Sequence, residues 1–202
     1  MEKIFENINN ITKISKEQFE ALKKYVDFLI DYNNKINLIG KSTIEDIWNR
    51  HIIDSLQISK LIDDNLTVAD LGSGAGLPGI PLSIVKVKNI TLFEKSPRKC
   101  EFLNQAKNFS SNKIIVKNEN LYDVKNESFD IIVSRALANL NLLLQFSDNL
   151  KKNDTKLIFL KGKKIFEELD IAKKYWNIEY QLFNSITSDE GKIVYITKFS
   201  KK

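Results

Sequence analysis

The chain has 202 residues, enough for one domain of ordinary size with a modest extension; 43% of them are hydrophobic and 28% are charged. This composition excludes a disordered or fibrous protein, and the single cysteine, Cys100, excludes both an internal disulfide framework and a multi-cysteine metal site. The sequence shows neither the layout of a signal peptide nor an apolar run of about 20 residues that could span a membrane, so we expect a soluble, cytoplasmic protein.

The net charge of +5 is unevenly distributed along the chain. Residues 1–66 hold 9 basic and 11 acidic side chains, a balance of −2, whereas residues 67–202 hold 22 basic and 15 acidic side chains, a balance of +7. A basic half favours a polyanionic partner such as nucleic acid. A general enrichment in lysine explains the same numbers, so charge alone leaves both interpretations open.

The first sixty residues have the apolar periodicity of helices. Ser15 and Gln18 form a capping box in front of one amphipathic segment, and Ser42 and Glu45 form a second box in front of another. The polar stretch 33–38 reads as the connection between them. We therefore predict an N-terminal helical module over residues 1–64.

From residue 66 onward, short β-branched or aliphatic runs alternate with helical segments. Runs that are apolar on both faces are typical of parallel strands covered by helices. The predicted strands are 66–71, 90–93, 114–116, 129–133, 157–160 and 193–196. Segments 97–109 and 140–150 are long enough to be crossover helices, and 175–202 reads as an antiparallel pair. The prediction is an α/β fold with a doubly wound sheet over residues 65–202.

A glycine-rich turn follows the first predicted strand. Residues 70–82 read Asp-Leu-Gly-Ser-Gly-Ala-Gly-Leu-Pro-Gly-Ile-Pro-Leu, with Gly72, Gly74 and Gly76 at alternate positions. Glycine permits positive φ and leaves the main chain open to a ligand because it has no Cβ. Open α/β sheets bind ligands at the carboxyl ends of their strands, where this turn lies.

The ligand of the turn is open on the pattern alone, because Gly74, Gly76 and Gly79 match the dinucleotide pattern G-x-G-x-x-G. Asp70 would repel a pyrophosphate, and Pro78 lacks an amide that could donate to one. S-adenosylmethionine, with an ammonium, a sulfonium and two ribose hydroxyls, fits better. Glu94, at the end of the next strand, could accept both hydroxyls. The structural alternatives are a helix cap for Asp70 and an ordinary surface acid for Glu94.

Four motifs in order now point to one family. They are Asn37-Leu38, Arg50-His51-Ile-Ile-Asp54-Ser55, the glycine turn, and the pair Ser134-Arg135-Ala136 with Leu160-Lys161-Gly162. From residue 37 to 162 the sequence resembles ribosomal RNA small subunit methyltransferase G, also called glucose-inhibited division protein B. The resemblance implies a class I, Rossmann-like methyltransferase fold with S-adenosylmethionine as cofactor. It also implies methyl transfer to N7 of the guanosine at position 527 of 16S rRNA in the small ribosomal subunit.

The resemblance also implies individual cofactor contacts. Carried over position by position, these are Gly72 and Leu77 in the turn, Leu121 and Tyr122 after the third strand, and Arg135 after the fourth. Asp70, Gly74 and Glu94 join them from the reasoning above. The sequence departs from the family's pattern at Asn120 and at Gly191-Lys192, where relatives carry arginine.

Methylation at guanine N7 needs no general base, because the attacking nitrogen is unprotonated. The sequence agrees, since its only histidine, His51, lies in the helical module. Arg135 is expected to position the cofactor or to bind guanine O6 or a phosphate, with Lys161 as a second anchor. An ion pair at a strand end is the alternative for Arg135, and a solvated lysine for Lys161.

Four further residues are candidates for RNA contact: Arg50, His51, Arg98 and Lys99. Packing between helix and sheet is the alternative for Arg50 and His51, and a solvated face is the alternative for Arg98 and Lys99. We expect no metal and a monomer. Rival functions are a methyltransferase with another RNA or protein acceptor, a non-catalytic ribosome-assembly module, and a nicotinamide oxidoreductase.

Overall fold

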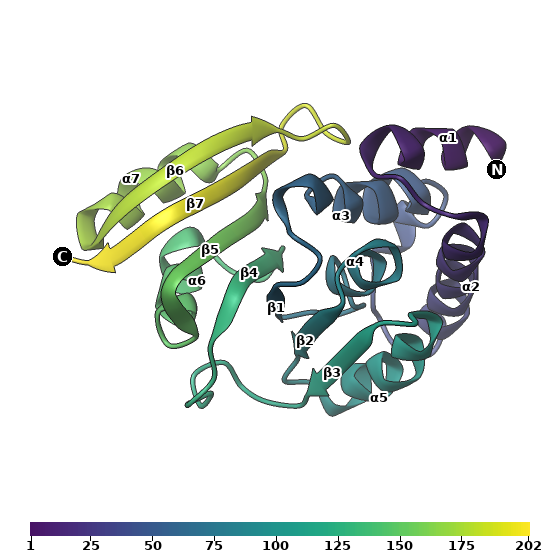
Figure 1. The fold of residues 1–202 in the computed structure, drawn as a ribbon, viewed down its shortest axis with the longest axis horizontal. Helices are drawn as coiled ribbons and strands as arrows, with labels where there is room; N and C mark the ends of the chain where they lie inside the picture. The colour runs from purple at the N-terminus through teal and green to yellow at the C-terminus, as the bar shows by residue number, and fades with distance from the viewer.

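The computed structural model describes residues 1–202 as an α/β fold built on one seven-stranded sheet (Figure 1). Its strand order is β3-β2-β1-β4-β5-β7-β6. Five strands are parallel, and β7 runs antiparallel to both of its neighbours. The strands are β1 (Thr67–Leu71), β2 (Asn89–Phe93), β3 (Lys113–Lys117), β4 (Phe129–Arg135), β5 (Lys151–Lys161), β6 (Trp176–Asn184) and β7 (Lys192–Lys201). The predicted doubly wound sheet and its antiparallel C-terminal pair are confirmed.

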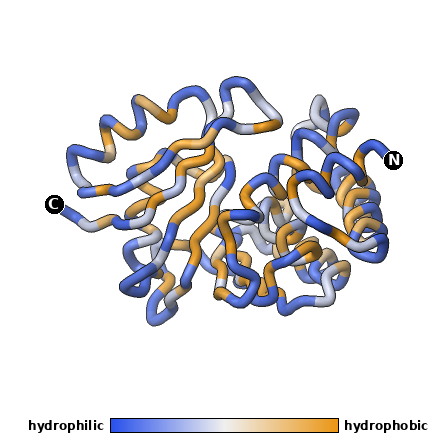
Figure 2. Tube along the Cα trace, turned by 45° about the horizontal axis from the view of Figure 1, so that its top comes forward, coloured by the Kyte–Doolittle hydropathy of each residue, from blue (hydrophilic) through white to orange (hydrophobic).

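Helices cover both faces of the sheet, and the strands alternate their side chains between two cores. On β5, Ile158 and Leu160 join a core shared with α4 (Gly79–Val85) and α5 (Pro97–Ala106). Leu157 and Phe159 join the opposite core, beneath α6 (Leu140–Asp148) and α7 (Ile165–Tyr175). Figure 2 shows hydrophobic residues along the central strands and hydrophilic ones on the connections. No helix in the molecule has both the length and the apolar character needed to cross a membrane.

The N-terminal module consists of three α-helices and three short helical turns of other types. Its elements are α1 (Glu2–Ile11), α2 (Lys16–Asn33), η1 (Lys41–Thr43), η2 (Trp48–Ile53), α3 (Asp54–Leu56) and η3 (Ser59–Leu61). The capping box at Ser15 and Gln18 is confirmed, and the Gln18 amide also donates to Ile84 O and Val85 O of α4. The module's buried side chains form one continuous cluster with those of the sheet. The boundary after residue 64 thus marks a change of secondary structure within a shared core, and as a domain boundary it stays a prediction.

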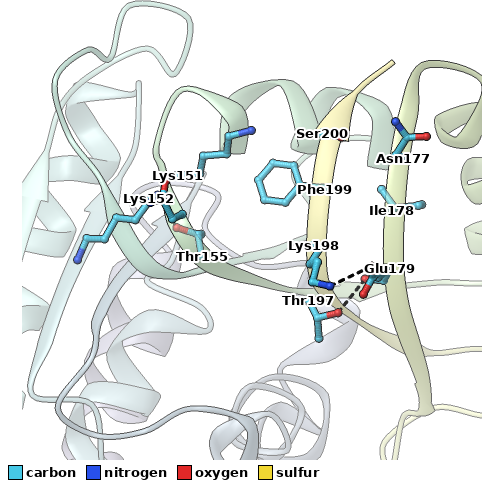
Figure 3. A pocket seen from close by; sticks show the side chains of 11 residues that line it. Lys151, Lys152, Thr155, Asn177, Ile178, Glu179, Thr197, Lys198, Phe199 and Ser200 are labelled. Carbon is cyan, nitrogen blue, oxygen red and sulfur yellow. Dashed lines mark hydrogen bonds and ion pairs between the residues drawn. The ribbon is translucent and has the colours of Figure 1, made fainter.

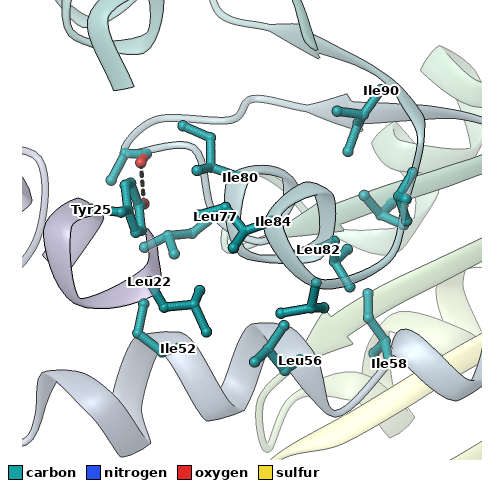
Figure 4. Packing of buried hydrophobic residues seen from close by; sticks show 14 of the residues in the cluster. Leu22, Tyr25, Ile52, Leu56, Ile58, Leu77, Ile80, Leu82, Ile84 and Ile90 are labelled. Carbon is teal, nitrogen blue, oxygen red and sulfur yellow. Dashed lines mark hydrogen bonds between the residues drawn. The ribbon is translucent and has the colours of Figure 1, made fainter. Parts of the chain in front are cut away.

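Helix α2 supports the glycine turn directly. Tyr25 is fully buried, and its hydroxyl donates a hydrogen bond of 2.6 Å to the carbonyl of Ala75 (Figure 4). Burial raises the pKa of Tyr25 well above its ordinary value, so the phenol stays protonated and remains a donor. Leu22 and Leu77 pack beside this bond. The N-terminal module therefore packs directly against the glycine turn and stabilises it.

Two sequence expectations about element boundaries are wrong. Ser42 and Glu45 do not form a capping box; the chain forms the 3-10 helix η1 there, with no side-chain cap. The Thr43 hydroxyl donates to Gly40 O and also meets His51, so local polar contacts favour a tight turn over a regular helix. β5 begins at Lys151 instead of residue 157, because its first residues are polar and give no apolar signal.

Candidate functional site

The carboxyl ends of three adjacent strands bring the candidate residues together. Leu71 at the end of β1 pairs with Phe93 at the end of β2 and with Ser134 near the end of β4. The glycine turn and Glu94 directly follow β1 and β2, and Arg135 is the last residue of β4. They come from positions far apart in the sequence and meet at one edge of the sheet, as the predicted topology requires.

The glycine turn has the backbone conformation that its sequence predicts. Gly72, Gly74 and Gly76 have φ values of 68°, 56° and 82°. A Cβ placed on Gly74 would meet nothing closer than Gly72 O at 3.9 Å, so open space adjoins the main chain at this point. The turn is therefore accessible to a ligand.

Glu94 holds the turn in place. Its Oε2 accepts from Gly74 N at 3.0 Å, and its Oε1 accepts from Ser96 N at 2.8 Å. Each carboxylate oxygen can accept two hydrogen bonds, so each retains capacity for a ligand hydroxyl. This arrangement fits the predicted binding of ribose hydroxyls, and the carboxylate is more than a surface acid.

Asp70 is more deeply buried than Glu94. Its side chain is fully buried, Oδ2 accepts from Gly79 N at 3.0 Å, and Oδ1 has no partner. Burial raises the pKa of Asp70 to about 7, although the bond from Gly79 opposes the shift. The geometry gives Asp70 the role of the helix cap that was its structural alternative, and its contact with a cofactor stays a prediction.

The other predicted cofactor residues differ widely in exposure. Leu77 and Leu121 are buried in the two cores, and their contact with a cofactor stays a prediction. Tyr122 is 64% exposed and packs edge-on against Phe146, with ring centroids 4.9 Å apart. The sequence reasoning missed Leu137, whose Cδ1 lies 2.4 Å from the position that a Cβ on Gly72 would occupy. No motif marks this leucine; only the fold places it over the turn.

Arg135 connects the sheet to the helical module. Its NH1 donates to Arg50 O at 3.1 Å and to Asp54 Oδ2 at 3.0 Å, and its NH2 lies 2.9 Å from His51 Nδ1. The guanidinium is 16% exposed. Three partners on one helical segment fix the plane of the guanidinium. The ammonium of a lysine could not make the same set of contacts. The ion pair at a strand end, its structural alternative, is therefore present, and it orients the guanidinium beside the turn.

His51 is the neutral partner in this arrangement. An arginine can only donate, so His51 Nδ1 must accept from Arg135, and Nε2 then donates to Thr43 Oγ1 at 2.7 Å. Burial lowers the pKa of His51 to about 4, and the charges of Arg135 and Arg50 add to the effect. Both ring nitrogens are in use, so His51 contributes packing and orientation rather than proton transfer.

A titration of the single histidine tests this geometry. We expect His51 to remain neutral down to about pH 4 and to show the Nε2–H tautomer in nitrogen-detected NMR spectra. Because the unfolded chain binds this proton near pH 6.5, the folded state loses stability through His51 as the pH falls from 6.5 to about 4. A midpoint near 6.5 would show that Arg135 does not lie against the ring.

Lys161 is already engaged within the protein. Its Nζ donates to Ala138 O at 2.7 Å and forms an ion pair with Glu168 at 2.6 Å, and its side chain is only 9% exposed. Glu168 also accepts from Leu140 N at the start of α6. These contacts fix the loop after Arg135. They favour a positioning role for Lys161 over the predicted phosphate contact, which no observation supports.

A cleft of about 590 Å³ opens beside Arg135. We call it the Arg135 cleft; seventeen residues line it: Arg50, His51, Asp54, Gln57, Arg135, Ala136, Leu160, Lys161, Gly162, Lys163, Lys164, Glu168, Ser185, Thr187, Ser188, Gly191 and Lys192. Basic side chains outnumber acidic ones on its walls, which suits a phosphate backbone. Arg50 is on the wall, but Arg98 and Lys99 lie at the start of α5 and do not line it.

A second hollow, of about 760 Å³, lies at the opposite edge of the sheet (Figure 3). The first residues of β5, the first of β6 and the last of β7 form its walls. It contains none of the candidate residues. Its three lysines are paired: Lys151 with Asp148 at 2.6 Å, Lys152 with Asp130 at 2.9 Å and Lys198 with Glu179 at 3.2 Å. The Arg135 cleft is therefore the candidate site.

Comparison with known proteins identifies the family. The model of the family described as rRNA small subunit methyltransferase G matches residues 18–194. The protein of that name from Gluconobacter oxydans is 38% identical, over 95% of this chain and 99% of its own length. The one from Rickettsia prowazekii is 37% identical, over 94% and 98%. The chain belongs to the rRNA small subunit methyltransferase G family.

Membership in the methyltransferase G family makes the chain an S-adenosylmethionine-dependent methyltransferase and removes the nicotinamide oxidoreductase alternative. Solved structures show the same fold. A ribosomal protein L11 methylase from Lactobacillus delbrueckii superposes with a TM-score of 0.61 at 19% identity, covering 79% of this chain and 80% of that one. TYW2 from M. jannaschii, crystallised with AdoMet, gives 0.57 at 17% identity, covering 83% and 80%.

Proposed function

We propose that this chain, acting as a monomer in the cytoplasm, transfers a methyl group from S-adenosylmethionine to N7 of the guanosine at position 527 of 16S rRNA in the small ribosomal subunit. The observation that carries the proposal is the Arg135 cleft, a basic hollow at the carboxyl ends of β4 and β5; β4 pairs with β1, the strand that leads into the glycine turn. The names of the relatives supply the rRNA acceptor.

The cleft suits a reaction without a general base. The imidazole of His51 uses both nitrogens in hydrogen bonds, and Asp54 is paired with Arg135. Guanine N7 attacks with a lone pair that needs no deprotonation, so the protein has only to align the two reactants and exclude water. When bound, S-adenosylmethionine supplies the electrophilic methyl group. As N7 becomes cationic, Arg135 acts away from it, on guanine O6 or a neighbouring phosphate.

The cofactor fits beside the glycine turn. The open main chain at Gly74 allows close approach, and Glu94 retains acceptor capacity for the ribose hydroxyls. The orphaned Oδ1 of Asp70 is one further acceptor near the turn. Gly72, Gly74 and Glu94 are the residues we assign to holding it, with the Tyr122 ring as a flanking surface.

Replacing Glu94 by glutamine tests this assignment. The amide oxygen of E94Q can still accept from Gly74 N, but the charge and one acceptor for the ribose are lost. We expect the affinity for S-adenosylmethionine, measured by calorimetry, to fall roughly 10- to 30-fold while the fold is retained. E119Q, at an exposed acid outside the turn, serves as the control. Equal affinities in the two variants would contradict the assignment.

The function itself is tested by transfer of labelled methyl to small ribosomal subunits isolated from cells that lack this protein. We expect label at one guanosine of 16S rRNA, located by strand scission at the N7-methylated base. Absence of label, with cofactor binding shown in the same preparation, would move the proposal to another acceptor or to a non-catalytic binding role.

A further inference from the structure

The loop joining β6 and β7 extends toward the helical module (Figure 1), and its residues form part of the wall of the Arg135 cleft. Ile186 N donates to Gln57 Oε1 at 3.0 Å, and Gln57 Nε2 donates to Ser185 Oγ at 3.2 Å. These residues are separated by 129 and 128 positions in the chain. The hairpin tip is thus tied to α3 by reciprocal side-chain and main-chain bonds.

Asp54 extends this connection to the arginine. Its Oδ1 accepts from Thr187 Oγ1 at 2.7 Å and from Gln57 Nε2 at 2.8 Å, and its Oδ2 accepts from Arg135 NH1 at 3.0 Å. The donor directions are consistent: the Thr187 hydroxyl gives its proton to Asp54 and accepts from Ser185 at 2.9 Å. Both oxygens of one carboxylate are therefore occupied: Oδ1 by the hairpin and by Gln57, and Oδ2 by the guanidinium.

We infer that Thr187 is a positioning residue for methyl transfer, which orients Arg135 through the carboxylate of Asp54 and so makes docking of the hairpin tip part of the assembled site. The inference rests on the proposed function of the Arg135 cleft. Its physical basis is that Thr187 supplies one of the two hydrogen bonds that Asp54 Oδ1 accepts, and a carboxylate that accepts more hydrogen bonds is held more firmly in one orientation. Thr187 itself touches no reacting atom.

The test replaces the hydroxyl and keeps the shape. T187V removes the donor to Asp54, T187S retains it, and T197V is a matched control at the far end of the same hairpin, where Thr197 Oγ1 donates to Glu179 O at 3.3 Å. We expect T187V to lower kcat for methyl transfer to small subunits about 10-fold with KM changed less than about 2-fold. T187S and T197V are expected to match the wild type.

A second readout follows the arginine directly. His51 is the only histidine, and the charged groups that act on it are Arg135, Arg50 and Asp46; Asp54 lies against the guanidinium of Arg135. If T187V releases Arg135 from the ring, the pKa of His51 rises above its wild-type value of about 4. A merely structural effect of the substitution would lower the melting temperature and leave the His51 titration where it is.

The outcomes separate the two proposals. The inference is supported if the wild type transfers the methyl group and T187V alone shows a lowered kcat and a raised His51 pKa. Transfer by the wild type with T187V unchanged in both readouts overturns it, and so does an equal loss in T187S. If the wild type transfers no methyl group to small subunits, the proposed function has failed, and the His51 titration still decides whether Thr187 positions Arg135.

Discussion

Replacing Arg135 by lysine is expected to slow methyl transfer about 100-fold or more at saturating S-adenosylmethionine. The guanidinium uses two nitrogens to reach Arg50 O, Asp54 and His51 at once, and a lysine ammonium cannot span these positions from the same strand end. Charge is retained in R135K, so the loss would report geometry rather than electrostatic attraction. The measurement is the single-turnover rate of label transfer into small subunits, with cofactor affinity determined separately.

The control for this experiment is R98K, the same exchange at an exposed position outside the Arg135 cleft. We expect R98K to transfer methyl at close to the wild-type rate. A wild-type rate in R135K would contradict the role assigned to Arg135. A loss that disappears at high cofactor concentration would assign Arg135 to cofactor binding instead.

The second large effect concerns stability and pH. Burial raises the pKa of Asp70 to about 7, against 3.8 for the unfolded group, so between these values the folded state binds the proton that the unfolded state has released. The contribution of protonated Asp70 to the free energy of unfolding is therefore fully present below about pH 4 and declines as the pH rises to about 7. The D70N variant lacks this decline. Its unfolding free energy relative to wild type should increase by roughly 3 kcal/mol from pH 4.5 to pH 8.

Asp130 provides a control of opposite sign. Burial opposes the shift, but hydrogen bonds from Thr67 and Lys152 lower the pKa of Asp130 to about 2. Its contribution is present above about pH 4 and is lost as the pH falls toward 2. Between pH 4.5 and 8, the difference in unfolding free energy between D130N and the wild type, measured by urea unfolding, should therefore stay constant. If the difference in unfolding free energy between D70N and the wild type also stays constant over this range, the pKa of Asp70 is not raised.

Local sequence signals determined the strands, the glycine turn and one helix cap. Apolar runs predicted β1, β2, β3 and β4 within two residues of their observed ends. In β1, β2 and β4, burial on both faces explains the continuous apolar signal. β5 was predicted too short, since Lys151 and the polar residues after it carry no such signal. The second capping box failed because Thr43 has tertiary and local partners that the pattern does not show. The apolar pattern therefore worked best for strands that are apolar along most of their length.

The sequence by itself determined the class of fold, the glycine turn and the family, because these depend on backbone permissiveness and on motifs contiguous in the chain. Only the tertiary structure decided what the charged side chains do. It buried Asp70 as a cap, tied Lys161 to Glu168, and joined Arg135 to Asp54 and, through it, to the hairpin. The physical reason is that the partners of these groups lie up to 133 positions away in the chain, and ionic and hydrogen-bonding contacts depend on distance in space rather than in sequence.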